Sequence, residues 1–132
     1  MKTVVISGSF HRHFDGIAKL IKKFESLGVG VLSPKDSRVI NSGAEFVLLE
    51  SDDTSNPQTL EQRHLDAIIS ADGFYLYNPE GYLGDSAKFE LGWANALHKP
   101  IFCKEPVNDA VLKFFCGTVA TPKQVYEALT NH

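Results

Sequence analysis

The sequence predicts an α/β fold, a flavodoxin-like or Rossmann-like three-layer sandwich with a mostly parallel sheet of about five strands. Short apolar, β-branched segments alternate along the chain with segments whose apolar residues recur at helical spacing. The connections are long enough for the crossover helices that parallel strands need. The 132 residues, 43% hydrophobic and 22% charged, fit one globular domain over residues 1–132.

The first half of the chain is expected to hold the first strands and two helices. Thr3–Ser7 is apolar almost throughout, as a strand buried on both faces should be. Asp15–Leu27 has apolar side chains at helical spacing, and Val29–Leu32 is a second short apolar strand. Glu45–Leu49 is a candidate for an extra edge strand. Pro57–Ala71 has the length and spacing of a second helix.

The second half continues the alternation. Its strands are short and apolar, and its helices are bounded by Asp, Ser, Thr, Pro or Gly, the residues that commonly cap or interrupt helices. Pro122 fits a first helical turn behind Thr121 as N-cap. The expected elements, in order, are strand Gly73–Tyr77, helix Ser86–Leu97, strand Pro100–Cys103, helix Asp109–Phe115, strand Thr118–Ala120 and helix Pro122–Leu129.

Composition excludes several classes of function. A net charge of −3 is unsuited to a nucleic-acid polymer, whose phosphates demand an excess of Lys and Arg. Cys103 and Cys116 are too few for a disulfide framework or a four-ligand zinc site, and their apolar surroundings predict buried thiols in a reducing compartment. We see no signal peptide or membrane-spanning run, and expect a soluble cytoplasmic protein with no membrane partner.

Sheets of this kind bind ligands beyond the carboxyl ends of their strands, so we expect the site at the turns after Ser7, Leu32, Tyr77 and Cys103. The first turn holds Gly8, which permits a tight bend, and the following helix can present amides to an anion. Neither a Gly-x-Gly-x-x-Gly fingerprint nor a Walker A pattern is present.

Two histidines in that first turn, His11 and His13, are not expected to bind a metal. Residues two apart share a face only in a strand, and this segment is predicted to be a turn. We expect one of them to line the binding site and the other to face solvent.

The segment after the third strand carries the most chemistry. Gly81 and Gly84 shape a loop, and Asp85 or Ser86 is expected to cap the following helix. Glu90 lies one turn into that helix and should point toward the strand ends, although a carboxylate there also suits the helix dipole. A second carboxylate, Asp72, precedes the third strand, at the end of the sheet opposite to that expected for the site.

Several motifs in this order resemble the nucleoside 2-deoxyribosyltransferase-like superfamily, which includes the transferases and the related nucleoside monophosphate N-glycosidases. The resemblance runs from Thr3 to about Phe102 and is more specific to the superfamily than to one reaction. The matching segments are Val5-Ile6-Ser7-Gly8-Ser9-Phe10, Leu32-Ser33-Pro34, Ala71-Asp72, Gly84-Asp85-Ser86, Glu90-Leu91-Gly92-Trp93-Ala94 and Lys99-Pro100.

The resemblance implies cleavage of the N-glycosidic bond of a nucleoside or nucleoside 5′-monophosphate. Glu90 matches the family's nucleophile, which forms a glycosyl-enzyme ester, and Asp72 matches the aspartate that protonates or orients the leaving base. Ser86 matches the loop that holds a 5′-phosphate, and Asp85 could hold a sugar hydroxyl. The further substrate-binding residues expected are Gly8, Ser9, Phe10, His11, Gly84, Lys88 and Trp93, with Tyr82 as an additional wall.

The resemblance further implies a homodimer or larger homo-oligomer and a reaction that needs no cofactor, since the nucleophile is a carboxylate. Two positions depart from the family. Lys88 replaces a small residue and could bind phosphate, pair with Asp85 or block the sugar. Phe10 lacks the hydroxyl of an aromatic residue usually found near the first turn.

Three functions stay open. The first is glycosidic cleavage, by hydrolysis or by transfer to a second base, with Ser86 and Lys88 favouring hydrolysis of a phosphorylated substrate. The second is a nucleotide-binding or sensing domain that has lost turnover, which the departures at Lys88 and Phe10 suggest. The third is a flavin protein, because the first turn loosely resembles the phosphate turn of flavin reductases.

Overall fold

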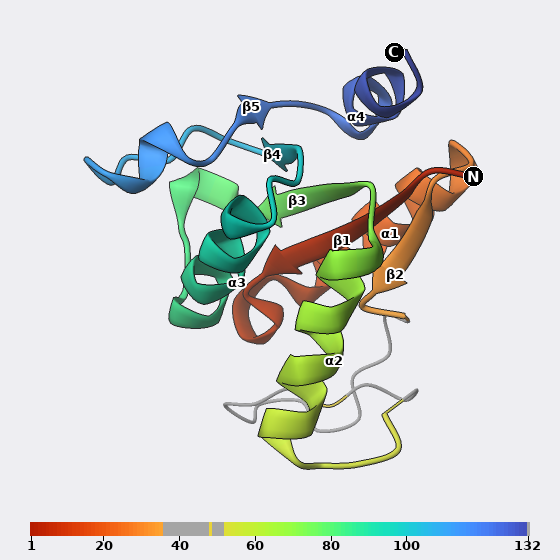
Figure 1. Ribbon diagram of the computed structural model, residues 1–132, viewed down its shortest axis with the longest axis vertical. Coiled ribbons are helices and arrows are strands. Elements are labelled where there is room, and N and C mark those ends of the chain that lie inside the picture. The colour runs from red at the N-terminus through yellow and green to blue at the C-terminus, as the bar shows by residue number, and fades with distance from the viewer. Residues whose placement is uncertain (36–47, 49–51, 132) are drawn as a thin grey trace.

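The computed structural model describes residues 1–35, 48 and 52–131. The helices and strands of that part alternate along the chain, with two short 3₁₀ turns between them (Figure 1). They are β1 (Thr3–Gly8), α1 (Phe10–Ser26), β2 (Gly30–Ser33), α2 (Pro57–Ser70), β3 (Gly73–Tyr77), η1 (Pro79–Gly81), α3 (Asp85–Ala96), β4 (Ile101–Cys103), η2 (Leu112–Phe114), β5 (Thr118–Val119) and α4 (Pro122–Thr130).

Within the described residues, the five strands form one sheet in the order β2-β1-β3-β4-β5, and every pairing is parallel. β1 lies between β2 and β3, with Val5 beside Phe74 of β3. The chain order reverses between β1 and β3, the switch point at which doubly wound sheets form their ligand crevice. The predicted fold class is confirmed.

The sheet is covered by helices on both faces, and alternate strand residues pack into two separate cores. On one face, Val5 and Leu76 pack with the buried side chains of α2 and α3. On the other face, Val4 and Ile6 pack with α1 and α4. Figure 1 shows α2 and α3 in front of the sheet and α1 behind it. This arrangement leaves the carboxyl ends of the strands, between α2 and α3, as the place for a site.

Local structure departs from the predictions at three points. α1 begins at Phe10 rather than Asp15, because the Ser9 side chain accepts a hydrogen bond from the Arg12 amide and caps the helix there. α3 is capped by Gly84, not by Asp85 or Ser86. The helix expected over Asp109–Phe115 is only the short turn η2, although the Asp109 carboxylate accepts hydrogen bonds from the amides of Val111 and Leu112 as a helix cap does.

Other predictions concern single features. Of the expected edge strand over Glu45–Leu49, all but Leu48 lies outside the described residues. Cys103 and Cys116 are free and buried, as expected, and burial raises the pKa of both thiols. Thr121 caps α4 through a reciprocal capping box with Gln124. No helix in the described part of the chain is long and apolar enough to cross a membrane.

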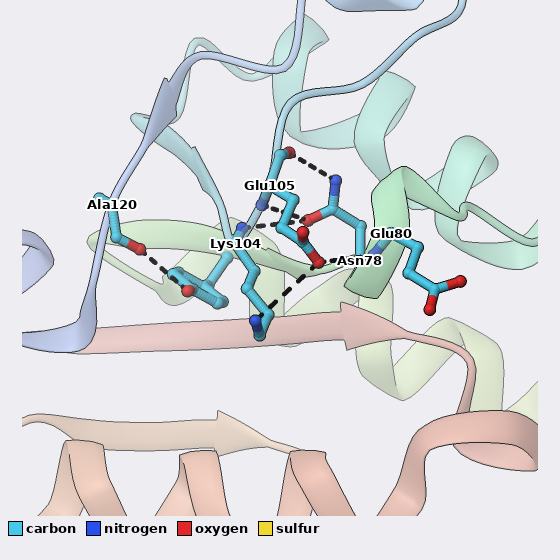
Figure 2. A network of polar contacts seen from close by, with 6 residues as sticks. Asn78, Glu80, Lys104, Glu105 and Ala120 are labelled. Carbon is cyan, nitrogen blue, oxygen red and sulfur yellow. Dashed lines mark hydrogen bonds and ion pairs between the residues drawn. The ribbon is translucent and has the colours of Figure 1, made fainter.

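A polar clasp joins the loop after β3 to the end of β4, as Figure 2 shows. The buried Asn78 side chain accepts hydrogen bonds from the amides of Lys104 (3.0 Å) and Glu105 (3.1 Å) and donates to the Glu105 carbonyl (2.8 Å). The Glu105 carboxylate in turn accepts from the amide of Glu80, whose φ is 60°. The clasp therefore holds the strained turn from which the chain enters α3.

Candidate active site

A cavity of about 840 Å³ opens at the carboxyl ends of β1, β2 and β3. The turns after these three strands supply one part of its wall, and α2 and α3 supply the rest. The turn after Cys103 contributes none of the lining residues in the described chain. Three of the four turns predicted from the sequence therefore converge on one cavity at the switch point of the sheet.

Glu90 lies in the wall of this cavity, on the second turn of α3. Its neighbours Ala87 and Leu91 are buried in the core below, and this packing fixes the rotation of the helix. Glu90 is itself only 6% exposed. A buried carboxylate needs compensating donors, because its charge is otherwise costly to remove from water. The predicted position of Glu90 at the strand ends agrees with this geometry.

His64, on α2, supplies part of that compensation. Its Nε2 lies 2.9 Å from the Ser7 hydroxyl and 3.4 Å from Oε1 of Glu90, and its Nδ1 lies 2.6 Å from the Ser33 hydroxyl. We assign the tautomer from these partners. Ser33 donates to Nδ1, which leaves the Nε2 proton directed at Ser7 and Glu90. The Ser7 hydroxyl then donates to the Glu90 carboxylate.

A second carboxyl, that of Glu61 on α2, hydrogen-bonds to Glu90. Both residues line the cavity. Two carboxyls in contact cannot both be ionised at little cost, so the pair holds one proton between them. Desolvation and the neighbouring Glu90 raise the pKa of Glu61 to about 8.

The state of Glu90 follows from the same contacts. Burial opposes its ionisation, but the interactions with His64, followed by hydrogen bonds from Glu61 and Ser7, prevail and lower its pKa below the ordinary value for a glutamate. At neutral pH the pair therefore consists of an ionised Glu90 and a protonated Glu61. A buried carboxylate with a proton donor beside it can act both as a nucleophile and within an acid–base step.

The turn after β1 forms another part of the cavity wall. Gly8, Ser9, Phe10 and His11 all line the cavity, as predicted. Gly8 lies where β1 and β3 approach closely, because a Cβ atom built there would lie 2.7 Å from the Tyr77 carbonyl oxygen. His11 belongs to the first turn of α1, whereas His13 stands at a kink in that helix, with a non-helical φ of −128° and ψ of 26°.

The start of α3 forms a third side. Gly84, Asp85 and Ser86 line the cavity there, and no side chain of the described residues caps the first amides of the helix. Free amides at a helix N-terminus suit an anionic group, although the Asp85 carboxylate competes for the same dipole. Tyr82, the additional wall expected from the sequence, also lines the cavity and carries the Arg12 guanidinium 4.2 Å above its ring.

Three of the expected site residues are not brought into the cavity. Asp72 is exposed at the amino ends of the strands, where it accepts hydrogen bonds from the Thr3 amide (2.8 Å) and hydroxyl (3.2 Å). Lys88 is exposed on the other side of α3 and interacts with Asp109. Trp93 packs against the core and donates its indole N–H to the Leu65 carbonyl (3.2 Å). The roles expected for these three residues in substrate binding or catalysis stay predictions.

The sequence reasoning missed Ser7, Glu61 and His64. A signal for Glu61 was present, because it falls on the same helical stripe as Leu65 and Ile68, the buried residues of α2. A glutamate on an apolar stripe needs a buried partner or a proton. His64 gave no such signal, since its partners come from β1, β2 and α3.

No protein-family model matches this sequence, and no curated protein is similar to it in sequence. Solved structures share its fold, among them the following two. One is a CMP N-glycosidase, BcmB, of Clostridium botulinum, at 20% identity and a TM-score of 0.58, covering 97% of each chain. The other is a 2-deoxyribosyltransferase of Bacillus psychrosaccharolyticus, at 15% identity and a TM-score of 0.59, covering 96% of this chain and 95% of that one. The chain thus has the fold that the resemblance implies.

Proposed function

We propose that this protein cleaves the N-glycosidic bond of a nucleoside or a nucleoside 5′-monophosphate, with Glu90 as the nucleophile. The observation that carries the proposal is the position of Glu90, a buried carboxyl group in the cavity wall whose Oε1 lies 3.4 Å from His64 Nε2, a contact that lowers the pKa of Glu90. The two structural neighbours, named as an N-glycosidase and a deoxyribosyltransferase, support the same class of reaction.

In the first step an oxygen of Glu90 bonds to the anomeric carbon of the sugar while the bond from that carbon to the base nitrogen breaks. The negative carboxylate stabilises the positive charge that develops on the sugar ring, and a glycosyl ester results. His64 and Ser7 fix the orientation of the carboxylate before the substrate arrives, so that little reorganisation is needed during the reaction.

In the second step an acceptor attacks the same carbon and frees Glu90. Water as acceptor gives hydrolysis, and a second base gives transfer. The two reactions use the same ester and differ only in the group that enters the cavity once the first base has left.

The other substrate contacts that we expect come from residues that line the cavity around Glu90. Ser86 and the first amides of α3 are suited to a 5′-phosphate, and Asp85 to a sugar hydroxyl. On the other side, Leu32 and Leu60 line the cavity with apolar surface that suits the face of a base. This leaves the anomeric carbon between the two, beside Glu90.

The experiment is chromatographic. The purified protein and its Glu90→Gln variant are incubated with ribonucleosides, deoxyribonucleosides and their 5′-monophosphates, with and without an added acceptor base, and free base is measured. We expect release by the wild type and a loss of about a thousand-fold or more in the variant. Ligand-induced thermal stabilisation without base release from any substrate would instead support a binding or sensing domain.

The homodimer or larger homo-oligomer implied by the resemblance stays a prediction of this proposal. Sedimentation velocity on the purified chain tests it, since a dimer has twice the mass of 14.6 kDa. A purified protein with flavin absorbance would favour the alternative of a flavin protein over glycosidic cleavage.

A further inference from the structure

Glu61 lies beside the proposed nucleophile on the wall formed by α2. Its Oε2 is buried and meets no hydrogen-bond donor among the described residues. Glu90, in contrast, accepts hydrogen bonds from His64 and Ser7. The shared proton therefore resides on Glu61, because the donors around Glu90 stabilise negative charge there and none does so at Glu61.

The position of Glu61 in the cavity determines which part of a bound substrate it can contact. It belongs to the helix that also contributes Leu60 and Ala67 to the lining, on the side of the cavity facing Leu32. Leu60 and Leu32 are the apolar residues assigned above to the base, and α2 also contributes polar residues such as Arg63 and Asp66 to the lining. A sugar centred at Glu90 with its base along α2 would bring the glycosidic nitrogen near Glu61.

We propose that Glu61 is the acid–base residue of the reaction. As Glu90 bonds to the anomeric carbon, the electron pair of the breaking bond goes to the base nitrogen, and that nitrogen takes the proton of Glu61. The products are a neutral free base, the glycosyl ester of Glu90 and the carboxylate of Glu61. Glu61 then removes a proton from the water that attacks the anomeric carbon, and the bond from that carbon to the Glu90 oxygen breaks, which restores Glu61 with its proton and Glu90 as carboxylate. This inference rests on the proposed function.

The contact between the two carboxyl groups determines at which step Glu61 gives up its proton. Before reaction, the negative charge of Glu90 keeps the proton on Glu61, and desolvation acts in the same direction. Once Glu90 becomes an ester, its charge is gone and Glu61 becomes a stronger acid. The proton thus becomes available in the step that consumes it, and the resulting carboxylate becomes available in the step that needs a base.

The test compares Glu61→Gln with the wild type on two substrates that share one sugar. The first is the nucleoside found to be cleaved, whose base leaves with a proton. The second is the 4-nitrophenyl glycoside of the same sugar, whose leaving group departs as a phenolate. Glu127→Gln, an exposed glutamate of α4 outside the cavity, is the matched control.

We expect Glu61→Gln to lose about a hundred-fold or more in kcat/KM on the nucleoside. On the nitrophenyl glycoside its loss of nitrophenol release, followed as an initial burst, should be no more than a few-fold. An equal loss on both substrates, or no loss on the nucleoside, overturns the role of Glu61 while leaving the proposed function in place.

A second measurement is used if the wild-type protein does not cleave the nitrophenyl glycoside. Formate added to Glu61→Ala replaces the missing carboxyl, and base release from the nucleoside should recover with formate concentration. Failure of formate to restore release then overturns the proposal. If the wild type releases neither base nor nitrophenol from any substrate, the proposed function itself has failed.

Discussion

Glu61 and Glu90 come from different helices and meet as a hydrogen-bonded pair of carboxyls in the cavity wall. The pair is asymmetric, because His64 and Ser7 interact with Glu90, whereas Oε2 of Glu61 meets no hydrogen-bond donor among the described residues. In an asymmetric pair of carboxyl groups, one member stays ionised and can act as a nucleophile, and the other keeps a proton and can act as an acid. The predictions below test this division and the placement of the residues around it.

Removal of His64 should release Glu90 from its position. In His64→Ala the carboxylate loses its contact with Nε2, and the pKa of Glu90 should move upward toward or above its ordinary value. We expect kcat to fall about ten- to a hundred-fold with a smaller change in KM. The pH profile of kcat/KM checks the cause, because its acidic limb should shift to higher pH. An unshifted limb would mean that His64 contributes to folding alone.

Asp72 should prove structural. Asp72→Ala removes hydrogen bonds to the Thr3 amide and hydroxyl at the amino ends of β1 and β3. We expect the free energy of unfolding to fall by about 1 kcal/mol, as measured by denaturant titration, with kcat/KM per folded molecule unchanged. A hundred-fold loss of activity at unchanged stability would return Asp72 to the catalytic role implied by the resemblance.

Lys88 and Ser86 should differ in their effects on a phosphorylated substrate. Ser86 lines the cavity at the start of α3, whereas Lys88 is exposed and directed toward Asp109. With a nucleoside 5′-monophosphate, Ser86→Ala should raise KM several-fold and Lys88→Ala should leave it unchanged. Steady-state kinetics on the phosphorylated and free nucleosides separate the cases. A larger KM effect from Lys88→Ala would contradict the placement of that side chain.

The carboxyl pair should also govern how stability depends on pH. The pKa of Glu61 is 4.5 in its ordinary state and about 8 in the folded protein, so between these values the folded chain keeps a proton that the unfolded chain gives up. The unfolded state then binds fewer protons, and the free energy of unfolding falls as pH rises through this window. The pKa of Glu90 is lowered in the folded protein, so the contribution of Glu90 to the free energy of unfolding is lost as the pH falls into the acidic range.

Glu61→Gln carries no titrating group at this position. We therefore expect the variant to gain stability relative to the wild type as pH increases from about 5 to about 8, with denaturant titrations at several pH values as the measurement. Parallel curves for the two proteins would show that Glu61 titrates as an ordinary glutamate and holds no proton in the folded state.

Much of the fold could be predicted because each element carries its own local signal. Gly73–Tyr77 has the predicted bounds, and α2 and α4 begin at the predicted prolines. The start of α1 could not be placed, because the capping hydrogen bond from the Arg12 amide to the Ser9 side chain competes with a turn that Gly8 equally permits. The absence of a full helix over Asp109–Phe115 could not be predicted, because Asp109 accepts hydrogen bonds from the amides of Val111 and Leu112 as a helix cap does, and yet only η2 follows among the described residues.

A site residue could be predicted from the sequence only where its position follows from its own helix or strand. Glu90 could be placed from its distance to the helix start and from the topology of parallel sheets. The position of Lys88 also follows from the helix, since residues two apart do not share a face. His64 depends on Ser7 and Ser33, which adjoin it only through tertiary packing, and no local spacing reveals such contacts.

The central claim is that Glu90 forms a covalent bond to the sugar, and intact-protein mass spectrometry tests it most directly. The protein is incubated with the 2-fluoro-sugar analogue of the cleaved nucleoside, because fluorine slows breakdown of the ester and lets it accumulate. We predict a mass increase of one fluorinated sugar, located by peptide mapping at Glu90 and absent in Glu90→Gln. Base release that leaves no adduct, or an adduct on another residue, would contradict the account.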